Sequence, residues 1–358
     1  MIAFRSHRFR NMGSTLLGLI ALLMPVRSGA ATHETKGVVL RLGTVAPNGS
    51  SVHKILLNMG AKWSRVPNGA NLRIYPGAIA GGEADMVRKM KIGELDAAAI
   101  TANGLADIDP AVQSLQGVPM LFRSLDEVDY VTDQLRPQLD QRLREKGFVA
   151  LFWLDVGWVR FFSKTAVQRP DDLKRAKLFT WAGDTQTFDV YKSAGFHPVA
   201  LETNDILPML RTGMINAVPY PPFFALTSQT FTVAKNMLDL DWAPLVGALV
   251  VTERSWNKLS PAAQAEMAKI AQEAGREMKA ENRAESDAAV EAMKKRGLHV
   301  YRPTPEEEKD WRRVAETSYP RIRGSVVPAD FFDQVQRLLA GYRASHPQTS
   351  IATTPKLP

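Results

Sequence analysis

Short β-rich runs alternate with stretches of helical periodicity along the first third of the chain, and this alternation limits the fold most. Strands are expected at 38–45, 72–75 and 97–101, and helices between them at 51–65 and 83–92. Turn sequences such as Ala46-Pro47-Asn48-Gly49 and Pro76-Gly77 separate these segments. Strands that alternate with helices favour an α/β fold with a mostly parallel sheet.

A second series of the same kind begins after Gly147. Strands are expected at 149–154 and 158–163, on either side of Asp155-Val156-Gly157, and again at 177–181 and 215–218. Helices are expected at 188–194 and 206–211, each closed by a glycine. The chain therefore reads as two α/β units of similar order, joined near residues 150–160.

One long helix is predicted after these two series. Ser260 suits an N-cap and Pro261 the first helical position, and residues 262–296 contain no proline and one glycine. A helix of this length extends about 50 Å, which is longer than one lobe is wide. We expect it to brace two lobes, and we expect disorder in the Pro- and Thr-rich tail at 346–358.

The first thirty residues read as a secretory signal peptide. Three arginines precede the apolar run 16–26, which ends at Ser28-Gly29-Ala30, and cleavage is expected near Ala30. The run is shorter than the ~20 residues of a membrane-spanning helix. Cleavage would lower the formal net charge from +8 to +4 and leave no block of like charges. We therefore expect an exported, periplasmic protein with no stable membrane insertion after cleavage and no nucleic-acid partner.

No sequence motif indicates catalysis, a cofactor or a metal site. The phosphate-binding, dinucleotide-binding, nucleophile-elbow and zinc-protease patterns are missing, and the chain has no cysteine. Its six histidines are scattered singly, so each is better explained as a surface or core residue. We expect no enzyme, although an exported enzyme of unknown reaction stays open as an alternative.

Five segments, in this order, resemble one family. They are LRLGTVAPNGSSVHK, PGAIAGGEADMVRKMKIGELDAAAIT, VPMLFRSLDEVDYV, AVQRPDDLKRAKLFTW and AGFHPVALETNDILPMLRTGMINAV. Together they are similar to the periplasmic solute receptors of TRAP transporters, of the dicarboxylate-receptor (DctP) type, over about residues 38–343. The long helix that follows Pro261 is also typical of that family.

The resemblance implies a two-lobed periplasmic-binding-protein fold with hinge strands, which closes around a small organic solute and delivers it to TRAP membrane permease subunits. On this basis lobe 1 is expected at 38–157, completed by about 243–258. Lobe 2 is expected at 158–242, completed by about 297–343, and the bracing helix at 260–296.

The carboxylate-binding residues of the family are replaced in this sequence. The resemblance places a family arginine, which would pair with a carboxylate, at Phe179, a second arginine at Val159, and a polar ligand contact at Tyr220. Aromatic side chains at these positions favour a hydrophobic or aromatic solute, and their faces could also accept an amine. The predicted ligand-binding residues are Trp158, Phe179, Trp181, Tyr220, Phe223 and Asn103.

Two other interpretations stay open. Aromatic side chains in an α/β lobe are more often core, and Trp153 and Trp242 are interpreted as core or hinge packing. The receptor could also bind an ordinary organic acid, such as a dicarboxylate, through relocated cations such as Arg160 or Arg211.

Overall fold

The computed structural model describes residues 37–347. The expected signal peptide at 1–30 and nearly all of the expected tail lie outside the described residues. No helix within 37–347 has both the length and the apolar composition needed to cross a membrane.

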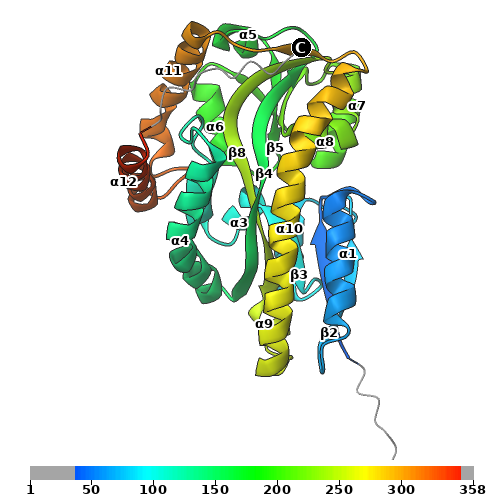
Figure 1. The fold of residues 1–358 in the computed structure, drawn as a ribbon. Helices are drawn as coiled ribbons and strands as arrows, with labels where there is room; N and C mark the ends of the chain where they lie inside the picture. The colour runs from blue at the N-terminus through cyan, green and yellow to red at the C-terminus, as the bar shows by residue number, and fades with distance from the viewer. Residues whose placement is uncertain (1–36, 348–358) are drawn as a thin grey trace, which may run out of the picture. The chain divides into compact units, whose positions relative to one another are not determined.

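A single mixed sheet joins nine strands of this region, in the order β2-β1-β3-β8-β4-β7-β5-β6, with β9 paired to β8. Its two long strands, β4 and β8, lie side by side (Figure 1). In the first series β1 pairs in parallel with β2 and β3, and in the second β5 pairs in parallel with β6 and β7, as expected. The two long strands differ: β4 runs antiparallel to β7, and β8 runs antiparallel to β3 and β4. The strands are β1 (Val38–Thr44), β2 (Ala70–Tyr75), β3 (Ala97–Thr101), β4 (Phe148–Ser163), β5 (Lys177–Trp181), β6 (His197–Leu201), β7 (Ala217–Tyr220), β8 (Asn236–Thr252) and β9 (His299–Tyr301).

Helices follow most of the strands, and several are capped by the side chain that precedes them. Ser50, Ser124 and Ser260 each accept a hydrogen bond from a backbone N–H in the first turn of the helix that they start. The α-helices are α1 (Ser51–Trp63), α2 (Glu83–Ile92), α3 (Ala102–Ala106), α4 (Leu125–Glu145), α5 (Pro170–Lys174), α6 (Thr185–Ser193), α7 (Ile206–Thr212), α8 (Pro222–Thr227), α9 (Glu253–Trp256), α10 (Pro261–Lys294), α11 (Pro305–Ile322) and α12 (Ala329–Ser345). Short 3₁₀ helices are η1 (Pro110–Leu115), η2 (Thr203–Asp205) and η3 (Thr230–Thr232).

The two longest strands connect the two parts of the sheet. The first half of β4 and the second half of β8 pair with each other beside β3, while the second half of β4 and the first half of β8 pair beside β7 and β9. Our expectation of two separate strands at 149–154 and 158–163 was wrong. Asp155-Val156-Gly157 forms an irregularity inside one strand, where the register with β8 shifts between Asp155 and Trp158.

Helix α10 packs along both parts of the sheet. Met267, Ala271 and Met278 belong to a buried cluster that also holds Leu40 of β1. Ala289 and Met293, further along the helix, lie in a cluster with Phe162 and Phe179 of the second part. The hinge strands and the long helix expected from the resemblance are therefore present, whereas the exact lobe boundaries stay predictions.

Candidate functional site

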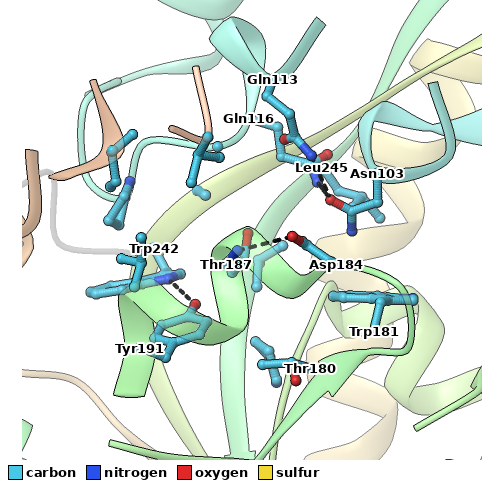
Figure 2. Close-up of a pocket in the computed structure, with 18 of the residues that line it drawn as sticks. Asn103, Gln113, Gln116, Thr180, Trp181, Asp184, Thr187, Tyr191, Trp242 and Leu245 are labelled. Carbon is cyan, nitrogen blue, oxygen red and sulfur yellow. Dashed lines mark hydrogen bonds between the residues drawn. The ribbon is translucent and has the colours of Figure 1, made fainter. Parts of the chain in front are cut away.

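A cavity that is open to solvent lies beside the central part of β4 and β8. Val159 of β4 and Leu245 of β8 form part of its wall. Segments from both parts of the sheet complete it, namely α3 and η1 on one side and the end of β5 with α6 on the other (Figure 2). Both parts thus contribute side chains to one hollow, at the place where the long strands pass from one part to the other.

Three of the six predicted ligand-binding residues line this cavity. Phe179 and Trp181 project from β5, with ring centroids 4.8 Å apart in an edge-to-face arrangement. Asn103 lies on α3, directly after β3, where we expected a loop facing the cleft. Val159, the position that the resemblance assigns to a second family arginine, also lines the cavity.

The other three lie elsewhere. Trp158 packs against the core formed by α3, η1 and α4. Tyr220 is buried at the end of β7 with its ring centroid 6.4 Å from that of Phe179. Burial raises the pKa of its hydroxyl. Phe223 is buried on α8. None of the three is among the residues that line the cavity.

Two aromatic residues that the sequence analysis did not select form another part of the wall. Trp242 donates a hydrogen bond from Nε1 to the hydroxyl of Tyr191, at 3.1 Å. Burial raises the pKa of Tyr191 to about 12, so this hydroxyl is neutral at physiological pH. Trp242 also packs edge-to-face on Phe161 and Trp311, so it serves the core as we expected and lines the cavity as well.

Three amide side chains meet at one end of the cavity. The backbone N–H of Val246 donates to Gln116 Oε1 at 2.9 Å, which leaves the Nε2 group of Gln116 to face Asn103 Oδ1 at 3.4 Å. Gln113 Nε2 donates to the same oxygen at 3.1 Å. Figure 2 shows the amide nitrogen of Asn103 turned away from the two glutamines and toward the side of Trp181.

Asp184 is the one residue with a charged side chain in the cavity lining. It caps α6, where its Oδ1 accepts a hydrogen bond from the backbone N–H of Thr187 at 3.0 Å. Burial raises the pKa of this carboxyl. No lysine, arginine or histidine lines the cavity.

The two arginines considered as alternative carboxylate-binding residues, Arg160 and Arg211, lie outside the cavity lining. Arg160 Nε is 3.0 Å from Asp239 Oδ1, and its Nη2 is 3.1 Å from Asp241 Oδ1. Arg211 is exposed near the end of α7. Neither residue lines the cavity, so binding of an organic acid through one of them stays a prediction.

A second, larger hollow adjoins the cavity and shares Asn103, Gln113, Trp181 and Asp184 with it. Its remaining charged residues are four acids and one arginine. Arg88 is that arginine, and it lies 2.9 Å from the carboxylate of Asp85. The acids other than Asp184 are Glu83, Asp85, Asp107 and Glu202. The approach to the cavity is therefore acidic. Even so, no group of three or more histidine and acidic side chains within 37–347 has the geometry to hold a metal ion.

Residues 42–324 match the family described as bacterial extracellular solute-binding protein, family 7 (DctP). This match covers well over half of the chain. The chain belongs to that family. It is therefore a solute-binding protein and not an enzyme.

Curated relatives and solved structures agree with this assignment. The chain is 25% identical to the 2,3-diketo-L-gulonate-binding periplasmic protein YiaO of Escherichia coli, over 64% of this chain and 70% of that protein. It is 22% identical to the C4-dicarboxylate-binding periplasmic protein DctP of Rhodobacter capsulatus, over 69% of this chain and 75% of that protein.

Among solved structures, a TRAP periplasmic solute-binding protein of Pseudomonas putida F1 with bound D-glucuronate superposes with a TM-score of 0.77. It shares 24% identity, over 84% of this chain and 97% of that one. A similar protein of Shewanella oneidensis with bound succinate gives a TM-score of 0.78 at 16% identity, over 84% and 99%. The α/β fold of the two-lobed receptors is thereby confirmed for the solute-binding protein described here.

Proposed function

We propose that this family 7 protein is the periplasmic receptor of a TRAP-type transporter, which captures a small organic solute and delivers it to membrane permease subunits. One observation carries the proposal: the cavity takes its walls from both parts of the sheet, beside the two strands that join them. A solute held there contacts both parts at once, so binding energy can stabilise a closed form.

The relatives favour an organic acid as the solute. Their names and bound ligands include 2,3-diketo-L-gulonate, C4-dicarboxylates, D-glucuronate and succinate. In this chain an acid would have to be held by the amide of Asn103 and by other neutral donors, because no cation lines the cavity.

The cavity lining favours a second class, a solute with an apolar or aromatic body. Phe179, Trp181 and Trp242 contribute rings to its wall. Burying apolar solute surface against them contributes about 25 cal/mol per Å² without a charged partner.

The receptor function is tested by identifying what the protein holds. Protein purified without denaturation is extracted with organic solvent, and the extract is analysed by mass spectrometry. A near-stoichiometric compound, whose rebinding is then measured by isothermal titration calorimetry, is the expected result. A carboxylate without an apolar body would support the relatives' class, and an apolar compound the second.

A matched pair of variants places the binding site. Trp181→Leu should weaken rebinding about ten-fold or more, because a large aromatic contact in a desolvated pocket is lost. Trp158→Leu removes a tryptophan that lies outside the cavity lining and should leave the affinity within about two-fold. Equal effects of the two substitutions would argue against this cavity as the solute site.

A further inference from the structure

We infer that the solute of this cavity carries a protonated amine, which the carboxylate of Asp184 binds, next to a hydrogen-bond acceptor that Asn103 binds. The inference rests on the proposed receptor function and narrows its substrate class to amine-bearing compounds with an apolar or aromatic body. An organic acid belongs to this class when it also carries an amine.

Asp184 has no positively charged partner among the residues that line the cavity. Its carboxylate accepts one backbone hydrogen bond from Thr187, and the residues lining the cavity offer it no cation. In the adjoining hollow the single arginine, Arg88, is engaged with Asp85. Asp184 is partly buried, and a partly buried carboxylate without a positive partner is unfavourable. An ammonium group from the solute would supply that partner.

The other acids of the adjoining hollow also favour an ammonium group over a carboxylate in the solute. Burial raises the pKa of Asp107, and the charge of Asp184 adds a smaller increase while Lys91 opposes it. Burial likewise raises the pKa of Glu202, with a smaller contribution from Asp85. A solute carboxylate beside Asp184 would add to this repulsion, whereas an ammonium would relieve it.

Hydrogen bonds from its neighbours fix the orientation of the Asn103 side chain. Because a backbone N–H can only donate, the bond from Val246 sets the amide of Gln116, and Gln116 together with Gln113 then sets Asn103 with its oxygen occupied. The Nδ2 group of Asn103 is left as a donor on the side of Trp181 (Figure 2). A carbonyl, ether or carboxylate oxygen of the solute fits this position.

An aromatic residue forms the cavity wall next to Asp184 and Asn103. Trp181 lies beside both, and the face of an indole ring attracts an ammonium group. Thr180, only 2% exposed, is also part of the lining, and its hydroxyl has no hydrogen-bond partner among residues 37–347. Figure 2 shows this hydroxyl on the side of Thr180 away from Asp184 and Asn103, so it is not assigned a contact with the amine.

Three probes that share one phenyl body test the inference by calorimetry at pH 7: phenethylamine, 3-phenylpropionate and L-phenylalanine. We expect phenethylamine and L-phenylalanine to bind about ten-fold or more tightly than 3-phenylpropionate, since a charge-assisted hydrogen bond is gained in one case and like charges meet in the other.

The variant Asp184→Asn should remove this preference, because the amide keeps the helix cap but not the charge. Affinity for phenethylamine should fall about ten-fold, and that for 3-phenylpropionate should rise. Asp189→Asn is the matched control, because Asp189 lies exposed on the same helix and lines neither hollow. It should leave both affinities unchanged.

Tighter binding of 3-phenylpropionate than of phenethylamine, or a preference that survives Asp184→Asn, would overturn the inference and leave the receptor function intact. The co-purified solute gives the same decision if no probe binds: a compound with an amine supports the inference, and one without an amine overturns it. A protein that holds no solute and binds no probe would contradict the receptor function itself.

Discussion

The solute cavity and an ion-pair cluster both adjoin the hinge part of β4, yet they use charge in opposite ways. The ion-pair cluster consists of Asp129 on α4, Asp155 on β4, and Lys279 and Arg283 on α10. Its two cations face two acids. The cavity begins four residues further along β4, at Val159, and has one acid and no cation in its lining.

Within the ion-pair cluster, Arg283 makes the central contacts. It reaches Asp155 through Nη2 at 2.6 Å and Nε at 3.1 Å, and it also reaches Asp129 through Nη2 at 2.6 Å. Hydrogen bonds to these two carboxylates outweigh desolvation and raise the pKa of Arg283. The cluster thus ties three elements together at the irregular point of the hinge strand.

Cations close to a hinge strand are therefore not by themselves evidence of an anion-binding site. Arg160 and Arg283 are both engaged by acids of this chain. Charge that joins elements is balanced within the protein, whereas charge that recognises a solute is left for the solute to balance. By this criterion Asp184, and not an arginine, is the recognition charge near the hinge.

The largest effect is expected from breaking the ion-pair cluster. Arg283→Met removes the hydrogen-bonded cation of Asp155, whose side chain is 3% exposed, and leaves it only Lys279 at 3.9 Å. The substitution should lower the free energy of unfolding by roughly 3 kcal/mol. Urea unfolding followed by circular dichroism measures the loss. Lys294→Met, on the same helix in an exposed pair with Glu291, should cost less than about 1 kcal/mol. Equal losses in the two variants would mean that the cluster contributes no more than a surface pair.

Another pair of variants tests how closely α10 packs against β4. A Cβ added to Gly275 would lie 2.6 Å from Cγ of Phe152 and 2.7 Å from its Cβ. Gly275→Ala should therefore cost about 1–3 kcal/mol of overpacking, although alanine gains about 1 kcal/mol over glycine in a helix. Gly341→Ala in α12, where a Cβ meets nothing within 4 Å, should stabilise the protein by about that helical gain. A stabilising Gly275→Ala would contradict the close approach of α10 to β4.

Much of the fold could be predicted from the sequence because its signals are local. Ser260 and Pro261 mark the start of α10, and its N-cap bond is present. The β1 and β5 strands were predicted to within one residue. Helix α6 begins three residues earlier than expected, since Asp184 caps it. The capping residue is also the recognition charge, and the sequence analysis did not select it.

The site was predicted only in part because strand faces depend on register. Trp158 was selected as one of a set of aromatic residues, but it is Val159, the next residue along β4, that lines the cavity. Neighbouring residues of a strand face opposite sides, and the register of β4 with β8 shifts between Asp155 and Trp158. Trp242 was missed because its role in the core gave no separate sequence signal for its contact with the cavity. Asn103 was predicted because it follows a strand, and Trp181 because it lies on the same strand as Phe179; both line the cavity.

The smallest effect tests whether a neutral hydroxyl, and not the charge of Asp184, sets the solute preference. Tyr191→Phe removes the acceptor of the Trp242 Nε1–H bond without changing the ring, and should lower the free energy of unfolding by about 1 kcal/mol. Combined with Trp242→Phe in a double-mutant cycle, it should show a coupling of similar size. The preference for phenethylamine over 3-phenylpropionate should stay within about two-fold of wild type, because a buried tyrosine with a pKa of about 12 carries no charge at pH 7. A lost preference in Tyr191→Phe would assign amine recognition to the hydroxyl and separate it from Asp184.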